Sequence, residues 1–145
     1  MRILFWNIRG FSGAGRRTLI KDLLRKHNID IICLQETIKQ DFTDLELQNL
    51  EVGEKFFWCW LPASGHSGGI LVGLKDSAFE VESTDKGQYF LSANCLHRAS
   101  NKPLTFIGIY GPTNHSASAA FLDEVSTNVA RCRCPILMGG DFNLL

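Results

Sequence analysis

Four apolar segments of this chain end in polar side chains that a hydrophobic core does not need. The segments finish at Asn7, at Glu36, at Tyr110, and at Asp141 with Asn143. Burying a carboxylate or an amide is costly unless the group has a partner or a ligand. Because ligands of open α/β sheets bind beyond the ends of strands, these side chains are candidates for one shared site.

The residue types at these strand ends favour metal-assisted hydrolysis of a phosphate ester. Carboxylate and amide oxygens are hard ligands, which suit Mg²⁺ or Mn²⁺ better than zinc. Glu36 and Asn7 are therefore the candidate metal ligands. Asp141 is the candidate catalytic group that orients or deprotonates a water molecule, and Asn143 would fix the nucleophile or the developing oxyanion. We expect Mg²⁺ or Mn²⁺ as cofactor and phosphoester hydrolysis as the reaction.

Each of these residues also has a purely structural interpretation. An Asp or Asn after a strand is more often a turn former or a helix cap than a catalyst. For one such residue alone, the structural interpretation is favoured by roughly two to one, since these residue types dominate turns. The occurrence of several such residues at successive strand ends is what favours a site.

The order of the predicted elements indicates an α/β fold. A strand at 2–8, a helix at 16–28 and a buried strand at 29–36 predict a βαβ-type start. Strand-like runs separated by turn residues fill the middle of the chain. A helical spacing at 116–132 and a last buried strand at 135–143 complete the pattern. With no linker or repeat, the chain is predicted to be one domain or part of one.

Composition and charge argue against several classes of protein. The 145 residues include 15 basic and 15 acidic side chains, which argues against a strongly basic protein that wraps nucleic acid. A local basic patch remains between Arg9 and Lys26. Five irregularly spaced cysteines, with no signal peptide and no transmembrane stretch, predict an intracellular, non-secreted protein without a membrane partner.

The strand-end motifs follow one another in the order known from one protein family. "FWNIRG", "IICLQET", "SGGILVG", "IYGP" and "GGDFN" occur at the approximate spacing of the endonuclease/exonuclease/phosphatase family, whose members resemble deoxyribonuclease I. The wording of the motifs is most similar to the endonuclease domain that opens the reverse-transcriptase protein of LINE-type retrotransposons, particularly those of plants. The resemblance spans essentially the whole chain, residues 1–145.

This resemblance implies a role for individual residues. Asn7 corresponds to the first-strand Asn near the metal of the family, and Glu36 corresponds to its metal-binding Glu. Tyr110 resembles the Tyr that contacts the scissile phosphate. Asp141 and Asn143 resemble the Asp that activates water and the Asn that supports it.

The resemblance also implies how the substrate is bound. The expected partner is the phosphodiester backbone of DNA, and the expected substrate-binding residues are Arg9, Tyr110 and Asn114. The stretch Ser67-Gly68-Gly69 matches the glycine-containing start of a family strand. We interpret this match as a backbone requirement, because glycine adopts conformations that other residues avoid.

The fold implied by the resemblance is a four-layer α/β sandwich, in which two packed β-sheets are flanked by helices. Family members continue for roughly another hundred residues, in keeping with domains of 200 to 250 residues. Their later part holds further acidic ligands and a Ser/Thr-Asp-His motif whose His faces the phosphate. None of the four histidines here follows Asp141, and none is assigned to that role. We therefore expect an incomplete domain over residues 1–145, with the second sheet largely missing and the chain inactive as it stands.

Three functions remain open at this point. The leading hypothesis is a Mg²⁺-dependent DNA endonuclease domain of a LINE-type retrotransposon, which would act in the nucleus. The second is a phosphatase or phosphodiesterase of the same superfamily acting on inositol phosphates, lipids or RNA, because one fold supports many substrates. The third is a non-catalytic remnant that binds nucleic acid. The basic stretch between Arg9 and Lys26 mildly favours a polyanionic strand.

Overall fold

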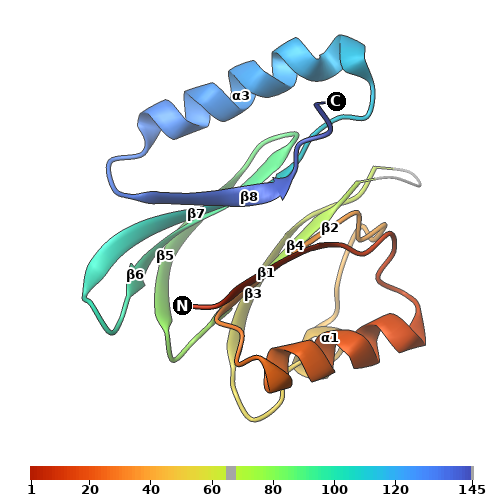
Figure 1. Cartoon of the computed structure of the whole chain (residues 1–145), viewed down its shortest axis with the longest axis vertical. Coiled ribbons are helices and arrows are strands. Elements are labelled where there is room, and N and C mark those ends of the chain that lie inside the picture. Colours follow the sequence, from red (N-terminus) through yellow and green to blue (C-terminus); the bar gives the residue numbers. More distant parts are fainter. Residues whose placement is uncertain (65–67, 145) are drawn as a thin grey trace.

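A computed structural model describes residues 1–64 and 68–144, which form two packed β-sheets flanked by helices (Figure 1). In chain order the elements are β1 (Ile3–Asn7), α1 (Ala14–Lys26), β2 (Ile31–Gln35), α2 (Asp44–Gln48), β3 (Phe56–Leu61), β4 (Ile70–Lys75), β5 (Phe79–Lys86), β6 (Phe90–His97), β7 (Lys102–Tyr110), the 3₁₀ helix η1 (His115–Ala117), α3 (Ser118–Arg131) and β8 (Ile136–Asp141). The α/β prediction is therefore confirmed.

The first sheet has the strand order β1-β2-β4-β3. Strands β1 and β2 are parallel, with Asn7 opposite Gln35, and α1 forms the crossover between them. All five residues of β2 are buried, which explains why this strand reads as a continuous apolar run without alternation. The predicted βαβ start is therefore present.

The second sheet has the strand order β5-β6-β7-β8. Strands β5, β6 and β7 form an antiparallel meander, and β8 joins the edge of the sheet parallel to β7, after the crossover through α3. The register places Tyr110 opposite Asp141. The carboxyl ends of β7 and β8 therefore lie at the same level, as do those of β1 and β2.

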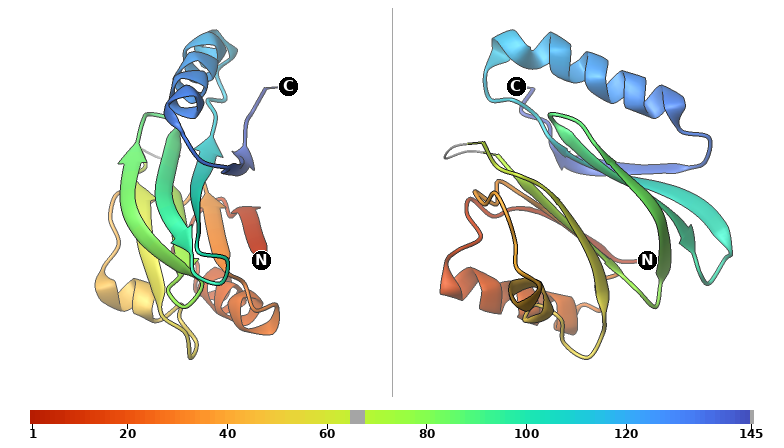
Figure 2. Two further views of the ribbon diagram at one scale, coloured as in Figure 1. Left: turned by 90° about the vertical axis from the view of Figure 1, so that its left-hand side faces the viewer. Right: turned by 180° about the vertical axis from the view of Figure 1, so that it is seen from behind.

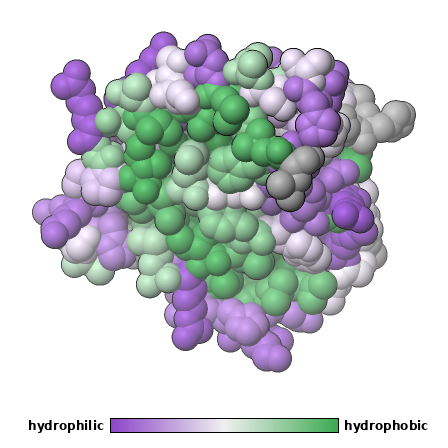
Figure 3. All heavy atoms as spheres, turned by 45° about the horizontal axis from the view of Figure 1, so that its top comes forward, coloured by the Kyte–Doolittle hydropathy of each residue, from purple (hydrophilic) through white to green (hydrophobic). Residues whose placement is uncertain are grey.

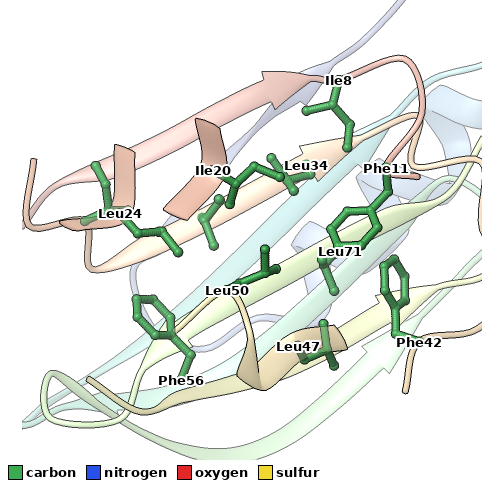
Figure 4. Packing of buried hydrophobic residues seen from close by; sticks show 12 residues of the cluster. Ile8, Phe11, Ile20, Leu24, Leu34, Phe42, Leu47, Leu50, Phe56 and Leu71 are labelled. Atoms are coloured by element: carbon green, nitrogen blue, oxygen red, sulfur yellow. The ribbon is translucent and has the colours of Figure 1, made fainter. Parts of the chain in front are cut away.

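Figure 2 shows the two sheets and the helices as packed layers. Three apolar clusters hold these layers together. In the cluster shown in Figure 4, Ile20 and Leu24 of α1 pack with Leu34 of β2 and Leu71 of β4. A second cluster fills the space between the two sheets, and a third lies between the second sheet and α3. Burial of apolar surface is the main force that keeps these layers packed, since it stabilises the fold by about 25 cal/mol per Å².

The second sheet is not largely missing, so that expectation from the sequence is wrong. It has four strands within the described residues, as many as the first sheet. The physical reason is the long parallel crossover. The run "PILMGGD" lies far from the meander in sequence, but α3 covers the outer face of the sheet and returns the chain to pair with β7.

The two sheets each end in a strand that carries exposed apolar side chains. Strand β1 is the edge of the first sheet and β8 is the edge of the second, with Phe5 36% exposed and Met138 39% exposed. Figure 3, which brings the α3 side of the molecule forward, shows a broad apolar area.

Within the described part of the chain, no helix combines the length and the apolar character needed to cross a membrane.

Candidate functional site

The carboxyl ends of the parallel strands from both sheets meet at one point of the sandwich. Nδ2 of Asn7 donates a hydrogen bond of 3.0 Å to Oδ2 of Asp141, although the two residues are 134 positions apart. Asn7 ends β1, the edge of the first sheet, and Asp141 ends β8, the edge of the second. The site therefore exists only when the two sheets are packed together.

The carboxylate of Asp141 is held by donors on both of its oxygens. Oδ2 accepts from Asn7, and Oδ1 accepts from the backbone N–H of Asn143 at 3.2 Å. The side-chain amide of Asn143 donates to the carbonyl oxygen of Gly111 at 2.8 Å, and the N–H of Gly111 donates to the carbonyl oxygen of Asp141 at 2.7 Å. Asn143 thereby fixes Asp141 and ties the segment after β8 to the segment after β7.

Glu36 directly follows β2, beside the end of β1. Its backbone carbonyl accepts a hydrogen bond of 2.7 Å from the N–H of Gly10, which links the loops after β1 and β2. Its half-buried carboxylate forms no hydrogen bond and no ion pair with any side chain in residues 1–64 and 68–144. A carboxylate that is partly withdrawn from water without a protein partner is suited to a cation.

The Tyr110 side chain interacts electrostatically with two acidic groups, Glu36 and Asp141. Burial raises the pKa of its phenol above the usual value, and the negative charges of Glu36 and Asp141 raise it further. Both charges act on the same hydroxyl, so Glu36 and Asp141 belong to one cluster around Tyr110. The phenol stays protonated at neutral pH and is available as a hydrogen-bond donor.

The loops around the cluster adopt unusual backbone conformations. Six described residues other than glycine have a positive φ. Four of them, Arg9 (53°), Glu36 (56°), Ile38 (55°) and Asn143 (51°), lie in loops that follow β1, β2 and β8, whereas Asn28 and Asn101 lie elsewhere. Left-handed backbone at residues other than glycine is costly, and it is concentrated at functional sites. The strain supports the assignment of a site to these strand ends.

The start of β4 requires glycine, as the sequence predicts. Gly68 and Gly69 have φ of 82° and 95°, and a Cβ at Gly69 would collide with Oγ1 of the buried Thr37. The N–H groups of Thr37 and Ile38 donate to the carbonyls of Gly69 and Gly68, at 3.4 and 3.1 Å. The backbone interpretation of this motif is confirmed for the two glycines, whereas Ser67, like His66, lies outside the described residues.

The two remaining predicted substrate-binding residues, Arg9 and Asn114, lie in the loops after β1 and β7. Arg9 is exposed, and its backbone N–H donates to Oδ1 of Asn7 at 3.3 Å. Asn114 has a structural role: its Oδ1 caps η1 by accepting from the backbone N–H of Ser116 at 3.0 Å. It also lines a pocket of about 290 Å³ together with Tyr110.

Several residues of the site were not selected from the sequence. Arg16 donates to the carbonyl oxygens of Arg9 and Gly10, at 2.8 and 3.0 Å, and so holds the loop after β1. Thr113 and His115 line a pocket of about 450 Å³ with Asp141 and Asn143. Their position directly after the "YGP" motif is the sequence feature that could have identified them as residues of the site.

The cluster fits a hard divalent cation by the chemistry of its donors. Glu36 supplies a carboxylate without a protein partner, and Asn7 supplies an amide oxygen whose nitrogen is turned to Asp141. No basic side chain of residues 1–64 or 68–144 forms an ion pair with Glu36 or Asp141. Groups of three or more His, Cys, Asp or Glu side chains suited to a metal do not occur among the described residues, so an ion here would take several ligands from water or substrate, as Mg²⁺ commonly does.

The cysteines take no part in the site. All five are free thiols, and burial raises the pKa of Cys33 to about 12. A thiol with so high a pKa is a poor nucleophile at neutral pH.

Comparison with known proteins agrees with the fold and the strand-end motifs. The model of the endonuclease/exonuclease/phosphatase family matches residues 4–144. An exodeoxyribonuclease of Bacillus subtilis (strain 168) is 33% identical over 69 residues, which are 47% of this chain and 26% of that protein.

Solved structures are similar over nearly the whole chain. A humanized TDP2 of D. rerio has a TM-score of 0.72 at 20% identity, with 99% of this chain and 66% of that chain covered. ANGEL2, a 2′,3′-cyclic phosphatase, has a TM-score of 0.73 at 17% identity, with 97% and 52% covered. A mannosyl-6-phosphatase of Bacteroides thetaiotaomicron has a TM-score of 0.69 at 14% identity, with 97% and 64% covered.

At these identities the structural likeness shows the fold, and the chain spans less than two thirds of the length of these three structures. The family model, in contrast, covers nearly every residue from β1 to the end of the described segment, including all of the strand-end motifs. The chain belongs to the endonuclease/exonuclease/phosphatase family.

Proposed function

We propose that the strand-end cluster is the centre of a Mg²⁺- or Mn²⁺-dependent phosphodiesterase that acts on DNA, as the endonuclease domain of a LINE-type retrotransposon protein. The observation that carries the proposal is the hydrogen bond between Asn7 and Asp141. It brings together the candidate metal ligands of the first sheet and the candidate base of the second, in a family of nucleases and phosphatases.

Glu36 and Asn7 would hold the divalent ion. When bound, such an ion polarises a phosphoryl oxygen and offsets the negative charge that develops in the transition state. The nitrogen of the Asn7 amide donates to Asp141, and its oxygen, which accepts from the backbone N–H of Arg9, has a second lone pair that would serve the ion. The Glu36 carboxylate suits this role because it forms no ion pair with a basic side chain of the described residues.

Asp141 would act as the general base. Its carboxylate accepts a proton from the attacking water while the water oxygen forms a bond to phosphorus and the bond from phosphorus to the leaving oxygen breaks. The N–H donors of Asn7 and Asn143 orient the carboxylate for this step. Tyr110, protonated at neutral pH, would donate its O–H to a phosphate oxygen.

DNA is favoured as substrate by the charge around the cluster and by the sequence motifs. Arg9 is exposed in the loop next to Asn7, and the exposed Arg16 lies in the first turn of α1, which follows this loop. Neutralised phosphates release counterions, so binding should weaken steeply as the salt concentration rises. The LINE-type assignment rests on the wording of "FWNIRG", "IICLQET" and "GGDFN", and it implies action in the nucleus.

The first test measures the binding of Mn²⁺, which is detected through the electron paramagnetic resonance signal of the free ion. Wild type is compared with Glu36→Gln, which keeps the shape of the side chain and removes its charge, and with Glu80→Gln as a control on the exposed face of β5. We expect Glu36→Gln to weaken binding by roughly tenfold or more, since a ligand is lost, and Glu80→Gln to have no effect. Equal binding by all three proteins would contradict the metal assignment.

Nicking of a supercoiled plasmid with Mg²⁺ is the second test. Activity of the wild type that disappears in both Glu36→Ala and Asp141→Asn supports the enzyme, and it would overturn the expectation that residues 1–145 are inactive by themselves. Activity that survives in Glu36→Ala would come from a contaminant and would count against the site. Saturable DNA binding without any metal-dependent nicking would favour the alternative of a non-catalytic, nucleic-acid-binding remnant.

A phosphatase or phosphodiesterase with another substrate is the second candidate. It is favoured by the similar folds of the mannosyl-6-phosphatase and the 2′,3′-cyclic phosphatase. Hydrolysis of a phosphomonoester, together with failure to nick DNA, would select this alternative. Both candidates use the same cluster, because the family shares its chemistry and differs in the loops that hold the substrate.

A further inference from the structure

We propose that His115 is a substrate-binding residue. It contacts a phosphate of the DNA backbone next to the scissile phosphate, which is attacked by the water that Asp141 activates. This inference rests on the proposed function and adds a residue to it. His115 is the first residue of η1 and lies in the connection between β7 and α3.

The pocket adjoins the candidate base directly. It has a volume of about 450 Å³ and is lined by Thr113, His115, Asp141, Phe142, Asn143 and Leu144. A second pocket, of about 290 Å³, shares Thr113 with the first and includes Tyr110 and Tyr89. A chain molecule whose scissile phosphate sits at Tyr110 and Asp141 would have a pocket at each of these two residues, which fits a phosphodiester within a polynucleotide.

The imidazole of His115 is not used by the fold. It is exposed, and it has no hydrogen-bond partner among the described residues. His97 differs, because its Nδ1 shares a hydrogen bond of 2.8 Å with Oγ of Ser100 and its ring packs on Phe79 at 5.5 Å. A ring that lines the pocket without a partner is free to donate an N–H to a ligand.

The backbone that carries His115 is held firmly to the cluster. Oδ1 of Asn114 accepts from the N–H and the hydroxyl of Ser116, at 3.0 and 2.9 Å, and so fixes the turn that contains His115. Earlier in the same connection, Gly111 is bonded to both Asp141 and Asn143. A binding residue on a fixed backbone loses little conformational entropy when the ligand arrives.

The charge of the pocket wall requires such a donor. Asp141 repels a phosphate group, and one of the two side-chain N–H groups of Asn143 already donates to Gly111. Among the six lining residues, His115 is the one whose side chain can carry a positive charge. Hydrogen bonds to a charged group contribute about 1.5 to 3 kcal/mol, which corresponds to roughly tenfold or more in affinity.

The test follows the imidazole signals of ¹³C-labelled protein by NMR during titration with a 12-base-pair DNA duplex, in EDTA so that no turnover occurs. We expect the His115 signal to move saturably while those of His27 and His97 do not. We expect His115→Ala to weaken DNA binding roughly tenfold, and His115→Gln, which keeps an N–H donor, to weaken it less. His97→Ala is the matched control and should bind as the wild type does.

Several outcomes would overturn the proposal. A His115 signal that does not move at saturation, equal DNA binding by His115→Ala and wild type, or a shift with inorganic phosphate but none with DNA would each exclude the assignment. Failure of the proposed catalysis is distinguishable, since it shows as absent nicking while the His115 shift is retained. Circular dichroism of His115→Ala checks that the variant folds, which its exposed position leads us to expect.

Discussion

Asn7 and Asp141 are joined by a hydrogen bond of 3.0 Å that bridges the two β-sheets at the carboxyl ends of their edge strands. The amide of Asn7 donates, and the carboxylate of Asp141 accepts. The same contact contributes to the stability of the sandwich and to the geometry of the proposed site. Its energetic consequences can be measured without any catalytic assay.

The first prediction concerns the replacement of this donor by a second carboxylate. Asn7→Asp places like charges against each other, whereas Asn7→Ala only removes the bond. We expect a loss of about 1 kcal/mol in the free energy of unfolding for Asn7→Ala and a larger loss for Asn7→Asp at pH 7. Urea unfolding at several pH values measures both.

The pH dependence of Asn7→Asp follows from the sign of the interaction. The neighbouring charge raises the pKa of the new carboxyl in the folded state, so its protonated form is compatible with the fold. The deficit relative to wild type should be small at low pH and grow as the pH rises through that raised pKa. Gln40→Glu, which adds the same charge at an exposed position, is the control. A deficit of equal size in the control would show that the contact is unimportant.

The second prediction concerns the titration of Tyr110. Burial and the charges of Glu36 and Asp141 raise the pKa of this phenol, so it should ionise above its usual pH. Glu36→Gln removes one of the two charges and should lower the pKa of Tyr110 toward the usual value, although burial keeps it raised. The absorbance at about 295 nm, with Tyr110→Phe as the blank, isolates this phenol from Tyr89. No change in Glu36→Gln, or the same change in Glu80→Gln, would place Glu36 away from Tyr110.

The third prediction concerns the close approach of β8 to β1. A Cβ at Gly139 would collide with the ring of Phe5, which stacks on Phe106 at 5.8 Å. We expect Gly139→Ala to destabilise the fold by about 1 to 3 kcal/mol, because the packed ring has to move. Phe5→Leu combined with Gly139→Ala should recover part of this loss.

A double-mutant cycle tests the contact itself. The two substitutions should show a coupling energy of at least about 0.5 kcal/mol, since residues in contact are not additive. Gly15→Ala, in α1 with no atom near the added Cβ, is the control for the change of residue type and should not destabilise. Strict additivity of Phe5→Leu and Gly139→Ala would contradict the packing.

The fourth prediction concerns the loop after β1. Arg16 donates to the carbonyl oxygens of Arg9 and Gly10, so Arg16→Gln should loosen this loop. We expect faster hydrogen exchange at the N–H groups of Gly10 and Phe11, which bond to Glu36 and Thr37, and a loss in global stability of about 1 kcal/mol.

Arg25→Gln is the matched control for this prediction. Arg25 lies on the same helix, and within the described part of the chain its exposed guanidinium forms an ion pair only with Asp22, at 3.7 Å. Exposed pairs of this kind contribute little to stability, so the exchange rates of the loop should stay unchanged in Arg25→Gln. Equal exchange in Arg16→Gln and wild type would show that the guanidinium does not hold the loop.

The sequence by itself determined the local features of this protein. Apolar runs with polar ends fixed the strands that finish at Asn7, Tyr110 and Asp141, and helical spacing indicated α1 and α3. The order of the motifs gave the family, which the match over residues 4–144 confirms. The short helix α2 was missed, although Thr43 and Glu46 form the capping box that its sequence "TDLE" signals.

Only the tertiary structure decided which of these features meet. The pairing of β8 with β7 completed the second sheet, which the sequence led us to expect largely missing. The same pairing set Asp141 against Asn7 and placed His115 in the pocket beside it. Local patterns report on burial and turns within a few residues, whereas these contacts join residues from distant parts of the chain. They arise from the packing of two sheets through apolar side chains, a non-directional force whose register no short motif specifies.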